Sequence, residues 1–136
     1  MIYITRKETF SAAHKLERKD WTEEHNMEVF GKCSNPNWHG HNYILHVTVK
    51  GEVNPETGFV INLSHVSEIL KSKVLAKVDH KNLNMDVDFM LGKLPSTENL
   101  AISIWNEIKE DITALGGILH CIKIQETDKN FVEYYG

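Results

Sequence analysis

Alternating apolar and polar positions predict that the chain begins with two long β-strands, residues 2–14 and residues 39–53. One face of the first strand carries Phe10, Ala12 and His14. One face of the second strand carries Tyr43, Leu45, Val47 and Val49. A turn at residues 54–58 contains Pro and Gly, so we expect residues 59–62 to return as the second arm of a hairpin.

Apolar residues then recur at three- and four-residue spacing, which predicts two helices. The first covers residues 64–78, and its stripe is Val66, Ile69, Leu70, Val74 and Val78. The second is capped by Ser96 or Thr97 and ends near Leu115, before two glycines. Residues 118–126 and 131–135 alternate again and predict two further strands.

Strands and helices do not alternate along the chain, so the predicted order indicates an α+β fold with an antiparallel sheet and helices on one face. Residues 17–37 are polar and predict a long loop, anchored by Trp21 and Phe30. The other face of the sheet also carries apolar residues. We therefore expect that face to be covered by oligomerisation.

Composition bounds the class of protein. The 136 residues suit one domain, and no apolar run or leader pattern predicts a membrane helix or a signal peptide. Fifteen basic against nineteen acidic residues give a net charge of −4, which argues against nucleic-acid binding. Two cysteines are too few for a disulfide framework and suggest a reduced, cytoplasmic setting. The eight histidines are the unusual feature.

The strongest local motif is His39-Gly40-His41. Residues two apart in a strand point the same way, so both imidazoles can hold one tetrahedral metal ion. His14, at the end of the first strand, could supply a third imidazole if the two strands are neighbours. Three protein ligands with one open position are typical of catalytic zinc. An exposed pair of strand-end histidines without a metal is the alternative.

Three other segments carry candidate chemistry. Cys33 lies in the polar loop, where a thiol near a metal can act as base or nucleophile, although a buried inert cysteine is the alternative. Asp79 and His80 follow the first helix, where the carboxylate can orient the imidazole or the histidine can simply stabilise the helix end. Glu126 shares a strand face with isoleucines, which is unexpected for a carboxylate without a partner. A planar heterocycle with adjacent N–H and amino donors would satisfy it.

Five segments occur in order along the chain: FSAAH at 10–14, GKCSNPNWHGHNY at 31–43, DHKNL at 79–83, STEN at 96–99 and ETD at 126–128. Together they resemble the 6-pyruvoyltetrahydropterin synthase family over essentially the whole chain. The resemblance implies that the zinc ligands are His14, His39 and His41. It implies a catalytic triad of Cys33, Asp79 and His80, and a pterin site with Glu126, Thr97 and Glu98.

The family's fold is the tunnelling fold, a four-stranded antiparallel sheet with two helices. The resemblance implies a trimeric barrel, stacked into a hexamer, in which the site is completed across a subunit boundary. It implies zinc-dependent conversion of 7,8-dihydroneopterin triphosphate to 6-pyruvoyl-tetrahydropterin with release of triphosphate.

Two alternatives remain, the related 6-carboxytetrahydropterin synthase and a non-catalytic, zinc-stabilised pterin-binding protein. The spacing Cys-x5-His-Gly-His favours the pyruvoyl enzyme. Trp38 departs from the family, because many close relatives carry Gly there.

Overall fold

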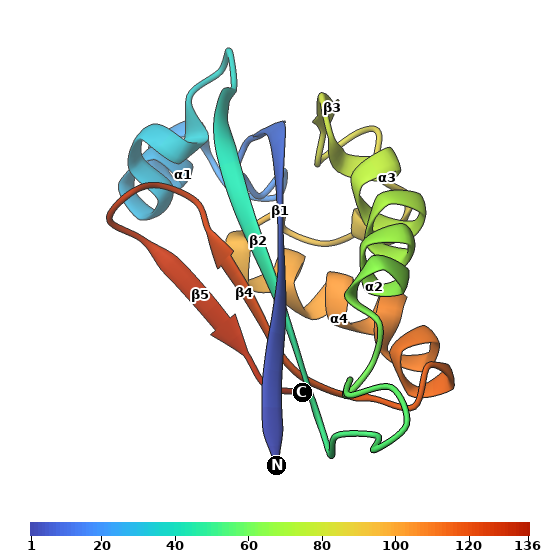
Figure 1. Cartoon of the computed structure of the whole chain (residues 1–136). Coiled ribbons are helices and arrows are strands. Elements are labelled where there is room, and N and C mark those ends of the chain that lie inside the picture. Colours follow the sequence, from blue (N-terminus) through green and yellow to red (C-terminus); the bar gives the residue numbers. More distant parts are fainter.

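Five strands form one sheet, in the order β3-β1-β2-β4-β5, in the computed structural model, which describes residues 1–136 (Figure 1). The strands are β1 (Ile2–His14), β2 (His39–Gly51), β3 (Lys81–Asn82), β4 (Ile118–Gln125) and β5 (Phe131–Tyr134). All neighbours are antiparallel except β3, which pairs in parallel with the end of β1. The α+β prediction is confirmed, but the expected purely antiparallel, four-stranded sheet is wrong.

The predicted hairpin arm at residues 59–62 is also wrong, because this segment forms no strand. Both edges of β2 are already occupied, since β1 pairs with it on one side and β4 on the other. The turn itself forms, and the Asn54 N–H donates to the Phe59 carbonyl at 2.8 Å. The chain then crosses the end of the sheet and enters the next helix.

The two predicted helices are confirmed and pack on one face of the sheet (Figure 1). The first is α2 (Leu63–Leu70), which continues through a π-helical turn at Lys71–Leu75 into α3 (Ala76–Val78). The second is α4 (Thr97–Ala114), and Ser96 caps it by accepting a hydrogen bond from the Asn99 N–H. No helix is both long and apolar enough to cross a membrane.

The expected loop at residues 17–37 contains a helix that sequence analysis missed. This is α1 (Glu23–Phe30), capped by Thr22 and followed directly by a 3-10 turn at Gly31–Ser34. Figure 1 shows α1 at the end of the sheet where β1 finishes and β2 starts. Its sequence is polar, so contacts with the rest of the chain, not an apolar stripe, must stabilise it.

The core lies between the sheet and the helices α2, α3 and α4. The opposite face is mostly polar, and it also carries some apolar residues as expected, such as Tyr3 on β1 and Phe131 on β5. Its positions on β1, β2 and β4 are mostly threonine, lysine and histidine, since the aliphatic residues of these strands alternate onto the core face. The exposed or half-buried residues there include Thr5, Lys7, Thr9, His46, Thr48 and Lys123.

Candidate active site

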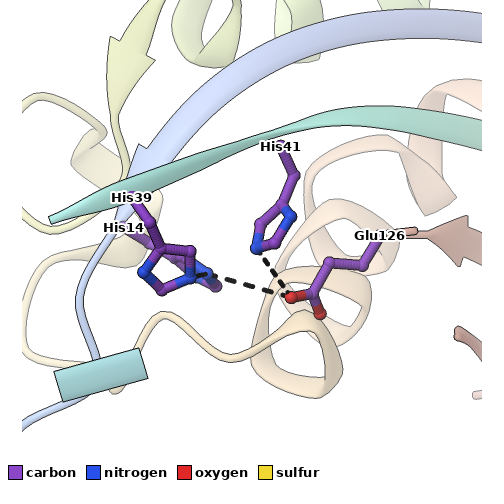
Figure 2. A group of neighbouring side chains, drawn as sticks. All are labelled: His14, His39, His41 and Glu126. Carbon is purple, nitrogen blue, oxygen red and sulfur yellow. Dashed lines mark hydrogen bonds and ion pairs between the residues drawn. The ribbon is translucent and has the colours of Figure 1, made fainter. Parts of the chain in front are cut away.

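Strand register brings three histidines together. His14 is the last residue of β1 and lies directly opposite His39, the first residue of β2. His41 lies two residues further along β2 and therefore on the same face. Figure 2 shows the three side chains converging on Glu126, the residue that follows β4. The predicted strand parity and neighbourhood of these histidines are confirmed.

The four side chains form a group that could hold a metal ion. One atom from each of them lies within 4.8 Å of the other three. His14 Nε2 lies 2.8 Å from His39 Nε2, and His41 Nε2 lies 2.8 Å from Glu126 Oε1. His14 Nδ1 donates to the Pro95 carbonyl at 2.8 Å, so its Nε2 carries no proton and directs its lone pair into the cluster, toward His39.

Burial makes these histidines suitable ligands. It is the largest cause that lowers the pKa of His14, His39 and His41 below the ordinary histidine value. The imidazoles are consequently neutral at neutral pH, which is the form that binds a cation. Three imidazoles and one carboxylate are a donor set that suits zinc.

Glu126 occupies a position that sequence analysis did not foresee. It was expected to face a pterin, and its proximity to the histidines depends on the pairing of β4 with β2, which the sequence pattern does not specify. Its Oε2 accepts a hydrogen bond from the Thr97 hydroxyl at 2.5 Å. A carboxylate has about four lone-pair sites, so both oxygens can accept further hydrogen bonds.

The three residues expected to bind a pterin line one cavity. Thr97, Glu98 and Glu126 line a space of about 320 Å³ together with Asn130, Phe131 and Val132. This volume lies at the lower end of the roughly 300–1,000 Å³ range of small-molecule pockets. A small planar ligand would therefore sit next to the histidine cluster.

Cys33 lies beside this cluster in the 3-10 turn and is half-buried. Burial raises the pKa of its thiol, and the negative charge of Glu126 raises it further. Within one chain the Cys33 side chain is consequently a neutral thiol at neutral pH. Ionising it needs positive charge from elsewhere.

Asp79 and His80 contact each other, and no hydrogen bond or ion pair joins either of them to Cys33. Asp79 Oδ1 accepts hydrogen bonds from the Ser11 N–H and from His80 Nδ1, both at 3.0 Å. The Ser11 hydrogen bond is the largest cause that lowers the pKa of Asp79. The His80 side chain is 82% exposed and lines a separate cavity of about 550 Å³ with Gly40. The structure therefore gathers Asp79 with His80, and Cys33 with Glu126, in two places.

Comparison with known proteins places this arrangement in a family. Residues 3–136 match the sequence model described as 6-pyruvoyl tetrahydropterin synthase. The 6-pyruvoyl tetrahydrobiopterin synthase of Homo sapiens is 42% identical over 133 residues, covering 98% of this chain and 90% of that protein. The chain belongs to the 6-pyruvoyl tetrahydropterin synthase family.

Two further proteins are similar to this chain, one with a solved structure and one with a different name. The solved structure of the Caenorhabditis elegans 6-pyruvoyl tetrahydropterin synthase is 38% identical, has a TM-score of 0.91, and aligns over 99% of this chain and 95% of that one. A 6-carboxy-5,6,7,8-tetrahydropterin synthase of Bacillus subtilis (strain 168) is 31% identical over 129 residues, covering 91% of this chain and 78% of that protein.

Two residues of this 6-pyruvoyl tetrahydropterin synthase family member adopt backbone conformations that side chains rarely take. Trp38 has φ 67° and His80 has φ 60°, and they are the only non-glycine residues with positive φ. The conformation of Trp38 explains why Gly suits this position. Such outliers gather at functional sites, and Trp38 directly precedes the cluster residue His39.

Tyr43 is a site neighbour that sequence analysis treated as core alone. It is fully buried, and its hydroxyl has no hydrogen-bond partner within the chain. Its ring stacks on Phe10 and meets the His41 ring edge-on, with centroids 5.6 Å apart. The sequence offered one signal for this placement, because Tyr43 has the same strand parity as His39 and His41 and therefore lies on the same face.

Proposed function

We propose that this protein converts 7,8-dihydroneopterin triphosphate to 6-pyruvoyl-tetrahydropterin and releases triphosphate. The observation that carries the proposal is the cluster of three histidines, whose partner Glu126 also lines the 320 Å³ cavity. The reaction is an internal redox change, because the pterin ring is reduced while two side-chain hydroxyls become carbonyls. It needs no nicotinamide, and the chain has no glycine-rich phosphate loop.

We propose zinc as the metal, held by His14, His39 and His41. When bound, zinc supplies a Lewis acid for the side-chain oxygens of the substrate. The neutral imidazoles and the hydrogen bond from His14 to Pro95 support this assignment.

Glu126, Thr97 and Glu98 would hold the pterin ring in the adjoining cavity. The carboxylate of Glu126 suits the adjacent N–H and amino donors of a pterin, which form a charge-assisted pair of hydrogen bonds. The hydroxyl of Thr97 fixes the carboxylate by donating to its Oε2. Glu126 therefore binds the substrate and takes no part in proton transfer.

Cys33 would take and return the substrate proton, and Asp79 with His80 would set its ionisation. The raised pKa of Cys33 within one chain supports a second source of positive charge. The exposed His80 of a neighbouring chain fits that role, since its own chain offers it only Asp79 as a charged partner. We therefore propose a site completed between two subunits.

A closed oligomer also suits the sheet edges. The outer edge of β5 is unpaired. β1 pairs with β2 along one edge, but along its other edge it pairs with β3 only at Ala12 and Ala13, so most of that outer edge is unpaired as well. Exposed strand edges are commonly closed by pairing with another chain. We propose the trimeric barrel and stacked hexamer of the tunnelling fold. The two free cysteines support a cytoplasmic location.

The test is analysis of the product by mass spectrometry after incubation with 7,8-dihydroneopterin triphosphate. The proposal expects 6-pyruvoyl-tetrahydropterin and triphosphate, and no product from the Cys33→Ala variant. Release of acetaldehyde with 6-carboxytetrahydropterin would instead identify the carboxy-forming reaction. Pterin binding without turnover would identify the non-catalytic alternative. The spacing of Cys33 and His39 favours the pyruvoyl product.

A further inference from the structure

The segment that links His14 to α1 is held by hydrogen bonds at three successive points. The amide of Asn84 accepts from the Lys15 N–H at 3.0 Å and donates to the Lys15 carbonyl at 2.8 Å. The Leu16 N–H donates to the Cys33 carbonyl at 2.8 Å. Residues 15–18 are therefore a fixed connection between the histidine cluster and the turn that carries Cys33.

The third point is Asn26, a polar residue of α1 that is only 5% exposed. Its Oδ1 accepts from the Arg18 N–H at 2.8 Å, and its Nδ2 donates to the Arg18 carbonyl at 2.9 Å. One amide thus satisfies both backbone groups of Arg18, as a neighbouring strand would. Burying an amide is costly unless both ends are hydrogen-bonded, and these two bonds meet that requirement.

The position of α1 determines the position of Cys33, because the two are joined without a loop. The helix ends at Phe30, and the Gly31 N–H donates to the Met27 carbonyl, so the 3-10 turn starts without an intervening loop. Cys33 is therefore held at one end by its own carbonyl and at the other by a helix that Asn26 fastens to Arg18.

We propose that Asn26 is a positioning residue that sets the place of Cys33 relative to the histidine cluster. The inference rests on the proposed function, in which Cys33 moves the substrate proton. Asn26 belongs neither to the histidine cluster nor to the lining of the Glu126 cavity, so it acts through α1 and the 3-10 turn. A reacting group displaced by about 1 Å can lose roughly a hundredfold in rate, so a fastening of this kind affects turnover directly.

The test is Asn26→Asp, which keeps the size of the side chain and removes the donor to the Arg18 carbonyl. We expect kcat to fall by about ten- to a hundredfold while KM and metal content stay within about twofold of wild type. Alkylation of Cys33 by iodoacetamide, followed by peptide mass spectrometry with Cys121 as internal reference, should accelerate by about threefold or more because the turn opens to solvent. A folded variant with wild-type kcat and wild-type alkylation would overturn the proposal.

Thr22→Ala is the matched control. Thr22 caps α1 by accepting from the His25 N–H at 3.1 Å, so this change weakens the same helix and leaves the Asn26 hydrogen bonds intact. We expect its kcat and Cys33 alkylation to stay within about twofold of wild type. An equal loss in Thr22→Ala would assign the effect to the stability of α1 in general and contradict a positioning role.

Hydrogen exchange in the wild-type protein tests the fastening even if Asn26→Asp does not fold. The Arg18 amide should exchange as slowly as the interior amides of α1, because a buried side chain accepts from it. Exchange at the rate of an open loop would overturn the proposal. Alkylation and exchange do not depend on pterin turnover, so they also separate this inference from the proposed function.

Discussion

The histidine cluster contains three neutral imidazoles, each of which can bind a cation through a nitrogen lone pair, and one negatively charged carboxylate. His14, His39 and His41 are neutral because burial lowers the pKa of each, while Glu126 supplies a negative charge at 2.8 Å from His41. A divalent cation would be held by three nitrogens and compensated by a nearby carboxylate.

The first prediction concerns these ligands. His39→Ala and His41→Ala should each lose stoichiometric zinc, falling from about one ion per chain to near zero when the purified proteins are analysed for metal. His46→Ala is the control, because His46 lies on the same strand but on the opposite face. Near-full zinc occupancy in both cluster variants would refute the assignment.

The second prediction concerns the ionisation of Cys33 in the metal-free protein. The charge of Glu126 raises the pKa of the thiol, so neutralising it in Glu126→Gln should lower that pKa. At a fixed pH of about 8 more thiolate is then present, and alkylation of Cys33 should accelerate about two- to tenfold. Glu98→Gln is the control. Glu98 lines the same cavity, but its charge is not among the causes that shift the pKa of Cys33. Equal alkylation rates in Glu126→Gln and wild type would contradict this coupling.

At the scale of elements, the sequence predicted correctly those features that depend on neighbouring residues, and it failed for those that depend on contacts between distant residues. The parity of His39 and His41 follows from neighbouring residues and was predicted correctly. The cap of α4 was predicted as Ser96 or Thr97, and the structure has Ser96. The pairing of β3 with β1 involves two residues of each strand and leaves no periodic signal. α1 was missed because its polar sequence is held by contacts such as the hydrogen bonds of Asn26.

The hairpin arm was predicted wrongly for the same reason, because the pairing of β2 depends on a strand that is distant in the sequence. Residues 59–62 carry an apolar, strand-like pattern, but β4 occupies the edge of β2 that they would have used. Sequence analysis had given Glu126 the same strand parity as Ile122 and Ile124. Its distance from His41 required the β2–β4 register, which only the folded chain defines.

The third prediction tests α4, the element that presents Thr97 to Glu126. Ser96→Ala removes the cap hydrogen bond to the Asn99 N–H and should lower the free energy of unfolding by about 1 kcal/mol in urea titrations. Ser64→Ala is the control, because Ser64 is exposed and Asn62 already caps α2. A change of stability no larger than that of the control would show that Ser96 does not cap α4.

At the scale of the whole molecule, the residues of the proposed triad lie in two groups within one chain. The group with the histidines, Glu126 and Cys33 lies on the core face, where β1 ends and β2 starts. The other group, Asp79 and His80, lies at the end of α3, with His80 exposed beside the larger cavity. The proposed site therefore joins Cys33 of one chain to Asp79 and His80 of a second chain.

Mixing two inactive variants tests this proposed site most directly. Cys33→Ala and His80→Ala homomers should each be nearly inactive, since one lacks the base and the other lacks the group that sets its ionisation. Oligomers refolded from an equal mixture should release triphosphate at about a quarter of the wild-type rate, because random pairing joins an intact Cys33 to an intact His80 at about one interface in four. A mixture that exchanges subunits, as shown by mass spectrometry of the intact oligomers, and stays as inactive as its parents would contradict the account and place the whole triad within one chain.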